Sequence, residues 1–214
     1  KVLCVTVNTV RKFPYRVYGN AQDLVGFSVP SAGKTFNGIS YHDTNIVNTS
    51  ESGYAVVKPG DPDVVYSSAA LSMAGGGAFQ RFDSRTGEIK QINVWPELAF
   101  GASSKDRKYR FNYHAPLVVS QHGSNAIYAA AQVVFRTLDE GQSWEKISPD
   151  LTRAEPEKLV RAGGLTPETT GQETYASIFA LAESPVKAGI LWAGSDDGLV
   201  HISKDDGKNW TLVT

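Results

Sequence analysis

The sequence contains a single cysteine, Cys4, among its 214 residues. One cysteine excludes an internal disulfide framework and any metal centre built from several cysteines. The four histidines occur singly, without the spacing of metal ligands. We therefore expect no bound metal, and nothing in the sequence indicates a cofactor.

An excess of charge of either sign is also missing. The chain has 21 basic and 22 acidic residues, for a formal net charge of −1. Proteins that bind nucleic acids or anionic membranes usually carry a basic excess, so neither partner is expected. No run of residues approaches the ~20 apolar positions that a membrane-spanning helix requires. The sequence predicts a soluble protein without a membrane span.

Long stretches with helical periodicity are scarce. Short β-branched or alternating runs dominate, among them "YAVV", "DVVYSSA", "PLVVS", "ILWAGS" and "LVHIS". Turn residues separate these runs at short intervals, which is the pattern of an all-β protein.

An internal repeat is the strongest signal in the chain. The octets "TLDEGQSW" (137–144) and "SKDDGKNW" (203–210) both fit the pattern S/T-x-D-x-G-x-S/N-W. Each follows a strand-like segment that carries an aromatic residue, Tyr128 in one case and Trp192 in the other, and Tyr66 takes the same position in an earlier segment. Self-similarity at a fixed period indicates a repeat architecture.

Three cycles of about 64 residues account for most of the chain, with predicted boundaries at 51–110, 111–172 and 173–214. The first cycle has a degenerate octet that keeps Asp83 and Gly87 but lacks the tryptophan. Residues 1–50 are predicted to hold the closing strands of a preceding cycle and a loop. Each cycle has room for four strands, the content of one β-propeller blade. The predicted fold is an all-β propeller segment of about three four-stranded blades.

The residue types of the octet have a structural explanation. An aspartate in a tight turn accepts hydrogen bonds from the backbone of that turn, and a serine or threonine hydroxyl can join the same network. The glycine supplies a positive φ, and the tryptophan packs between adjacent blades. The residues with this structural role are Thr137, Asp139, Gly141, Trp144, Ser203, Asp205, Gly207 and Trp210.

These octets resemble Asp-boxes, also called BNR repeats, which occur in sialidases, sortilin-type receptors and xyloglucan-active glycosidases. The flanking segments, among them "FPYRVYGNAQD", "KYRFNYHAPLVVS" and "VFRTLDEGQSWEKISPDLTR", are similar to large bacterial exported proteins with sortilin-like or glycosidase-like propellers. This resemblance covers most of the chain. It implies a seven-bladed ring or a tandem propeller, and an extracellular or periplasmic location.

Three blades do not close a ring, and an open set leaves strand edges unpaired. The chain also begins at Lys1 without a methionine and ends abruptly at Thr214. We therefore expect further blades, from the same longer polypeptide or from another copy, as partners of this segment.

In propellers that this chain resembles, ligands bind at the channel mouth opposite the Asp-boxes, on loops that lead into each innermost strand. The corresponding loops here are 50–54, 106–114 and 170–175. The ligand-binding candidates in these loops are Tyr54, Arg110, Asn112, His114 and Tyr175. The structural alternative is that Arg110 and Glu173 pair between blades while the tyrosines fill the channel.

Two functions of different class follow. The first is a non-catalytic binding or scaffold module that recognises a protein or glycan partner at the channel face. The alternative is a secreted, xyloglucanase-like glycoside hydrolase, which needs two carboxylates, ~6.5–9.5 Å apart if it inverts configuration. Candidates for these carboxylates are Asp23, Asp43, Glu51 and Glu173. A sialidase is not expected, because the arginines do not assemble into the triad that this enzyme family uses.

Overall fold

A computed structural model of the chain describes residues 2–7, 13–21, 24–49, 51, 53–69, 77–161, 163, 165 and 174–214. This part of the protein is all-β and contains four antiparallel sheets of four strands each. Its short 3₁₀ helices are η1 (Tyr41–Asp43), η3 (Ser104–Asp106) and η4 (Pro156–Lys158). Within the described ranges, no helix has the length and apolar character needed to cross a membrane.

Each sheet is built from four strands that are consecutive in the chain and paired in chain order. The first sheet consists of β1 (Val2–Val7), β2 (Arg16–Ala21), β3 (Phe27–Pro30) and β4 (Asn45–Ile46). The second consists of β5 (Ala55–Lys58), β6 (Asp61–Ala69), β7 (Ala78–Asp83) and β8 (Glu88–Gln91). The third consists of β9 (Leu117–Val119), β10 (Ile127–Ala130), β11 (Val134–Thr137) and β12 (Glu145–Lys146). The fourth consists of β13 (Ile178–Glu183), β14 (Leu191–Ser195), β15 (Val200–Ser203) and β16 (Thr211–Leu212).

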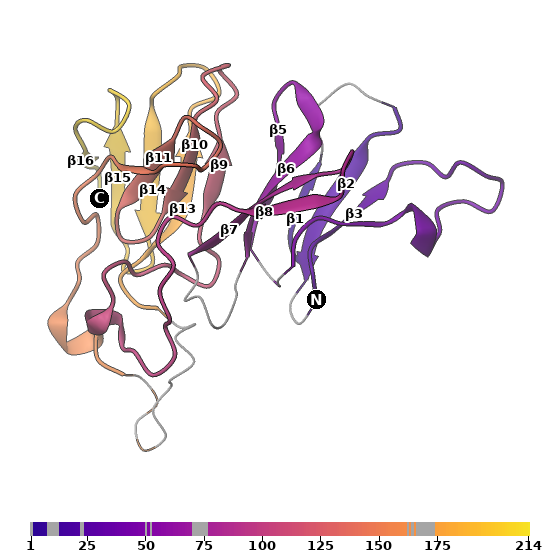
Figure 1. The fold of residues 1–214 in the computed structure, drawn as a ribbon. Coiled ribbons are helices and arrows are strands. Elements are labelled where there is room, and N and C mark those ends of the chain that lie inside the picture. The colour runs from indigo at the N-terminus through magenta and orange to yellow at the C-terminus, as the bar shows by residue number, and fades with distance from the viewer. Residues whose placement is uncertain are drawn as a thin grey trace.

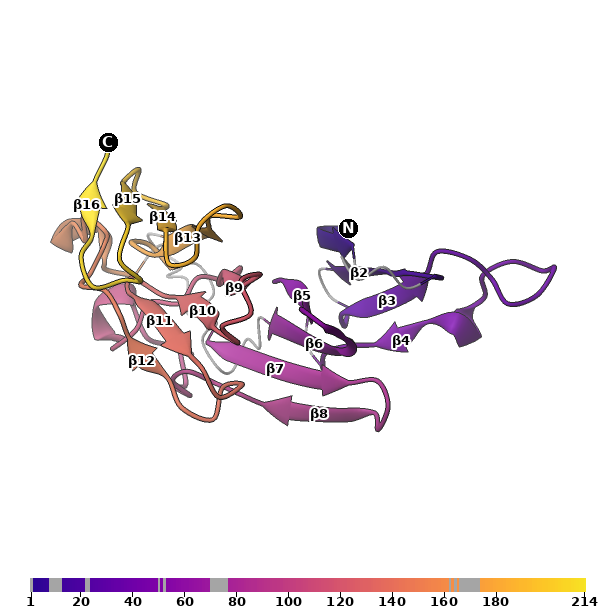
Figure 2. The ribbon, with the colours of Figure 1, turned by 90° about the horizontal axis from the view of Figure 1, so that it is seen from above.

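The four sheets lie face to face in chain order (Figure 1). Strand β5 contacts both β1 and β9, and β9 in turn contacts β13, so the first strands of successive sheets are neighbours. Figure 2 shows the sheets spreading from this line like a fan, with β8, β12 and β16 on the outside. The second and third sheets therefore each present one face to the preceding sheet and the other to the next.

Alternation along the second strand of each sheet divides its side chains between these two interfaces. Val64 and Tyr66 of β6 belong to a buried cluster shared with the third sheet, whereas Val65 between them belongs to a cluster shared with the first. The same division in β10 places Ile127 toward the second sheet and Tyr128 toward the fourth. A central strand buried on both faces must be apolar at successive positions, which explains the continuous runs in the sequence.

The N-terminal segment differs from the sequence-based prediction. Residues 2–46 contain a complete four-stranded sheet, not only the closing strands of a preceding repeat, so the described residues form four sheets where the sequence predicted about three blades. The first sheet escaped recognition because it lacks the octet: a long connection through η1 joins β3 to β4. The other three predicted segments, 51–110, 111–172 and 173–214, each contain one sheet.

Candidate functional site

The two octets form nearly identical hydrogen-bonded turns after β11 and β15. In the first turn, the Thr137 hydroxyl donates to Asp139 at 2.7 Å and accepts the Gly141 N–H at 3.0 Å. The Asp139 carboxylate also accepts the Ser143 N–H at 2.9 Å and the Ser143 hydroxyl at 2.6 Å. The turn is thus closed by its own side chains.

The second turn repeats these contacts with Ser203 and Asn209 in place of Thr137 and Ser143. Ser203 donates to Asp205 at 3.0 Å and accepts from Gly207 at 2.9 Å. Asn209 donates to Asp205 through its backbone at 2.9 Å and through its side chain at 2.6 Å. In both turns the carboxylate acts as an internal acceptor, which leaves it little capacity for a ligand.

The tryptophan of each octet reaches back to the preceding sheet. The Trp144 indole N–H donates to the carbonyl of Ile92 at 3.0 Å, just after β8. The Trp210 indole N–H donates to the carbonyl of Ile147 at 3.0 Å, just after β12. Each octet therefore ties its own sheet to the one before it.

A second inter-sheet contact uses the variable fourth position of the octet, to which the sequence analysis assigned no role. Glu140 and Asp206 occupy it, both with positive φ, and both reach the preceding sheet. Glu140 pairs with Lys58 and, at 2.7 Å, with the Arg81 guanidinium of β7. Burial and this Glu140 carboxylate raise the pKa of Tyr66, which lies opposite Arg81 in the sheet.

The same constellation recurs one sheet later. The Tyr128 hydroxyl donates to Asp206 at 3.0 Å, and Arg136, which lies opposite Tyr128 in the sheet, forms an ion pair with the same carboxylate. A tyrosine and an arginine of one sheet thus receive an acid from the next sheet at two successive interfaces. The sequence signal was an acid at the fourth octet position and an arginine in the third strand of the preceding sheet. Arg81 lies 59 residues before Glu140 and Arg136 lies 70 residues before Asp206, so only tertiary structure joins them.

The pKa of Asp139 provides a test of the turn network. Hydrogen bonds from the Ser143 side chain and backbone, and then from Thr137, lower this pKa to about 2. Because the folded-state pKa lies below the ordinary value of 3.8, the resulting stability is present above pH 4 and is lost as the pH falls toward 2. We expect Asp139→Asn to be less stable than the wild type at pH 6 and to lose less stability between pH 5 and pH 2.

Thermal unfolding followed by circular dichroism across this pH range measures both effects. Ser143→Ala serves as the companion variant, because it removes the largest cause of the shift while keeping the carboxylate. It should raise the pKa of Asp139 and move the acid-sensitive range toward pH 4. Identical pH profiles for the wild type and Asp139→Asn would show that this network does not stabilise the fold.

The loops that lead into the first strands of the second, third and fourth sheets, named here the lead-in loops, lie against one another. The Gly53 N–H donates to Nδ1 of His114 at 3.4 Å, which connects the second and third sheets. The Asn112 side chain donates to the Ser177 hydroxyl at 3.1 Å, which connects the third and fourth. The His114 ring also meets Phe179 edge-on, with 6.2 Å between ring centroids. Two of the predicted ligand-binding residues thus hold neighbouring loops together.

Arg110 is buried and committed to structural contacts. Its Nε donates to the carbonyl of Ala176 at 2.9 Å, and its Nη2 donates to Asp150 at 2.6 Å and to Thr152 at 3.1 Å. Its own N–H donates to the Gln132 side chain at 2.7 Å. This arrangement resembles the structural alternative for Arg110, with Asp150 as the acid that the sequence analysis did not anticipate.

The remaining candidates occupy different surroundings. Tyr54 packs partly buried against the core between the second and third sheets. The Tyr175 hydroxyl donates to Glu155, and this hydrogen bond is the main reason that the pKa of Tyr175 rises to about 12. Glu51 is half-buried and forms an isolated bridge before β5. Asp23 and Glu173 lie outside the described residues.

An acid that sequence reasoning missed adjoins the lead-in loop of the fourth sheet. Asp196, in the hairpin between β14 and β15, accepts hydrogen bonds from the Ser177 backbone and hydroxyl, both at 3.0 Å. Burial raises the pKa of Asp196. Among the described residues, no group of three or more His, Cys, Asp or Glu side chains is arranged to hold a metal ion.

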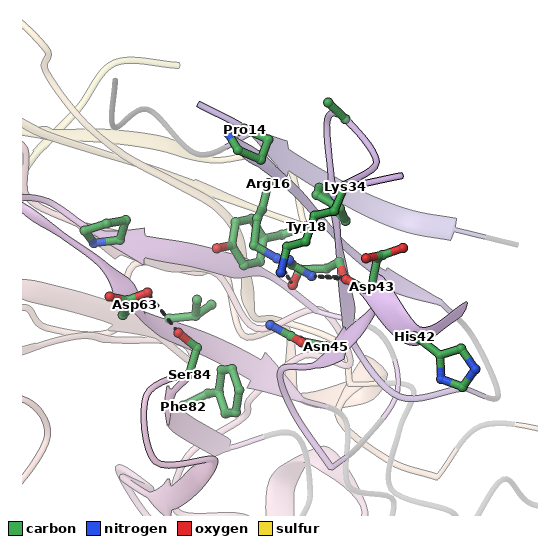
Figure 3. Close-up of a pocket in the computed structure, with 15 residues that line it drawn as sticks. Pro14, Arg16, Tyr18, Lys34, His42, Asp43, Asn45, Asp63, Phe82 and Ser84 are labelled. Atoms are coloured by element: carbon green, nitrogen blue, oxygen red, sulfur yellow. Dashed lines mark hydrogen bonds between the residues drawn. The ribbon is translucent and has the colours of Figure 1, made fainter. Parts of the chain in front are cut away.

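A pocket of about 380 Å³ opens between the first and second sheets. Figure 3 shows Arg16, Tyr18 and Lys34 from the first sheet and its long connection, and Asp63, Phe82 and Ser84 from the second. None of the residues that line this pocket belongs to a lead-in loop, but one of them, Asp43, was a candidate carboxylate of a glycoside hydrolase.

Neither a protein-family model nor a curated protein matches the chain. The function must therefore be inferred from the repeat and from the geometry of these surfaces.

Proposed function

We propose that this chain is a segment of an Asp-box β-propeller that acts as a non-catalytic binding or scaffold module, recognising a protein or glycan partner at its channel face. The observation that carries the proposal is the arrangement of the sheets. Their first strands contact one another in chain order, and the later strands spread outward (Figure 2). Blades around a propeller axis have this arrangement. An extracellular or periplasmic location belongs to the same proposal, through the resemblance to exported proteins.

The exposed face of the fourth sheet supports the presence of further blades. Tyr66 and Tyr128 are 1% and 2% exposed, because the next sheet covers them. Trp192 occupies the equivalent position of β14 and is 42% exposed. A further blade, from a longer polypeptide or from another copy, would cover Trp192 as the third and fourth sheets cover the two tyrosines.

The lead-in loops favour binding over catalysis. Their polar side chains hold adjacent loops in fixed positions, which reduces the ordering that a ligand would have to impose. Burial lowers the pKa of His114, so its imidazole is neutral at neutral pH and can serve as a hydrogen-bonding group. A glycoside hydrolase needs two carboxylates at a defined separation; Glu51 lies in a lead-in loop, whereas Asp43 lines the pocket between the first and second sheets.

A paired binding and turnover assay tests the proposal. The protein is incubated with an array of plant and bacterial polysaccharides, including xyloglucan, and both retention and release of reducing ends are measured. We expect retention without turnover, and we expect His114→Ala to weaken the retention. Reducing-end release that disappears in Glu51→Gln or Glu173→Gln would overturn the proposal in favour of the glycoside hydrolase.

A further inference from the structure

The second and third interfaces between successive sheets repeat the same contacts, and the first interface lacks some of them. At the second and third interfaces, the octet glycine of the following sheet packs on an isoleucine just after the fourth strand of the preceding sheet. A Cβ added to Gly141 would lie 2.5 Å from Ile92, and one added to Gly207 would lie 2.7 Å from Ile147. At the first interface, a Cβ on Gly87 in the degenerate octet would meet nothing within 4 Å. The turn after β7 therefore does not fill this interface.

The cavity of about 380 Å³ lies at this incomplete interface. Val65 and Phe82 of the second sheet line it, and both also pack in the buried cluster shared with the first sheet. Tyr18 of β2 lines it from the opposite side and is 3% exposed. The cavity thus lies between two sheets, and both sheets contribute to its walls.

The cavity retains the tyrosine and the guanidinium that bind a carboxylate at the other two interfaces. Tyr18 lies opposite Ser28, as Tyr66 lies opposite Arg81. The guanidinium comes from Arg16. Its Nε donates to the Ser28 hydroxyl at 2.9 Å, and its Nη2 donates to the carbonyls of Ser28 at 2.8 Å and Asp43 at 2.7 Å. These bonds hold the Arg16 guanidinium beside Ser28, the residue of the first sheet that lies opposite the tyrosine as Arg81 and Arg136 do in the next two sheets.

At the first interface, the turn after β7 carries no counterpart of the acids Glu140 and Asp206. With Gly87 aligned on Gly141, the degenerate octet places Arg85 and Thr86 where the complete octet places Asp139 and Glu140, so neither position carries an acid. Arg16 forms no ion pair with a described residue, and its Nη1 donates to none of them. Nor does any described residue hydrogen-bond the Tyr18 hydroxyl. Lys34 lines the cavity as a second cation, as Lys58 joins Arg81 around Glu140.

Two acids also face the cavity, and both have partners. The Asp43 carboxylate accepts the Ser40 N–H and hydroxyl, each at 2.9 Å, and the Asp63 carboxylate accepts the Ser84 hydroxyl at 3.0 Å. These carboxylates would repel an anion in the centre of the cavity. They can accept N–H groups of a peptide whose own carboxylate lies at the Arg16 end.

We infer that this cavity binds an aspartate or glutamate side chain presented by a turn of a partner protein. The ligand carboxylate would accept hydrogen bonds from Arg16 and Tyr18 and pair with Lys34. Within the chain, Glu140 pairs with an arginine and a lysine, and Asp206 with an arginine and a tyrosine. The two filled interfaces favour a peptide over other carboxylates, because in both of them the acid is carried by a turn with positive φ. This site is distinct from the channel face and does not depend on it.

The chain itself supplies a probe. A synthetic peptide with the sequence of residues 135–147, "FRTLDEGQSWEKI", carries the acid of a complete octet. Titration of the full 214-residue protein with this peptide, by calorimetry and by NMR of the tyrosine ring signals, measures the affinity. We expect saturable binding that the Glu140→Gln version of the peptide weakens about tenfold, since charge-assisted hydrogen bonds are lost.

Variants of the protein locate the site. Lys34→Glu, at an exposed position, should weaken binding about tenfold, and Tyr18→Phe about threefold. Lys90→Glu makes the same charge change on exposed β8 and should leave the affinity unchanged. Arg16 is not replaced, because its guanidinium also holds β3 through Ser28. His114→Ala should leave peptide binding unchanged, because His114 lies in the lead-in loops and not in this cavity. Failure of the cavity proposal is therefore distinguishable from failure of the channel-face proposal.

Several outcomes would overturn the inference. Absence of peptide binding, equal affinity for the Gln version, or an affinity unaffected by Lys34→Glu would each do so. Saturable binding of glucuronate without binding of the peptide would also overturn it and would identify the cavity as a site for acidic sugars.

Discussion

Gly141→Ala is expected to lower the free energy of unfolding by roughly 3–5 kcal/mol. Two effects add. The residue has φ of +84°, a conformation that an L side chain adopts only with strain, and its Cβ would lie 2.5 Å from the Cβ of Ile92. That atom belongs to the branched part of a side chain that is 1% exposed, so it cannot move aside without shifting the interface between the second and third sheets. Urea unfolding followed by tryptophan fluorescence measures the change.

Gly198→Ala is the matched control. Gly198 has a similar φ of +88°, but a Cβ there would meet nothing within 4 Å. This variant should lose only the conformational contribution, roughly 1–2 kcal/mol. Equal losses for the two variants would show that close packing of the octet glycine on the preceding sheet contributes nothing to stability.

Arg110→Met is expected to destabilise the protein by roughly 2–4 kcal/mol. Methionine keeps the unbranched stem of the side chain but removes the donors to Ala176, Asp150 and Thr152. The Ala176 residue is fully buried, so its carbonyl would lose a partner away from water. The contact between the lead-in loop of the fourth sheet and the third sheet would weaken. Thermal and urea unfolding measure the loss.

Arg85→Met provides the comparison, because Arg85 also pairs with acids but its side chain is 51% exposed. Solvent screens such pairs, and we expect a change within about 1 kcal/mol. If Arg110→Met were as mild as Arg85→Met and abolished ligand binding, Arg110 would belong to a ligand site and not to the framework between sheets.

The octet explains why part of this protein can be predicted from sequence. All hydrogen bonds that close the turn at Asp139 join residues no more than four positions apart, so the residue types and their spacing are sufficient to foresee them. The strand pattern is equally local, and the all-β class follows from it. The first sheet was missed because its β3–β4 connection has no octet, and without that motif its strands lacked the landmark that marks the repeat.

Contacts between repeats could not be predicted from the sequence. Arg110 was proposed for a ligand site because its loop has the right place in the repeat, but its neutralising acid, Asp150, lies 40 residues further on. Glu140 and Asp206 looked like variable positions of a turn. Their role depends on which residue of the preceding sheet the turn meets.

The sequence by itself determined the class of the fold, the repeating unit and the chemistry of its turns, because these depend on alternation and on hydrogen bonds between near neighbours. Tertiary structure alone decided which surfaces are filled and which are open. Arg16, Tyr18 and Asp63 come from two sheets that pack face to face, and they surround a cavity because the turn after β7 stops short of the first sheet. The separation between this turn and the first sheet cannot be predicted from spacing along the chain, since it is set by the packing of one sheet on the next.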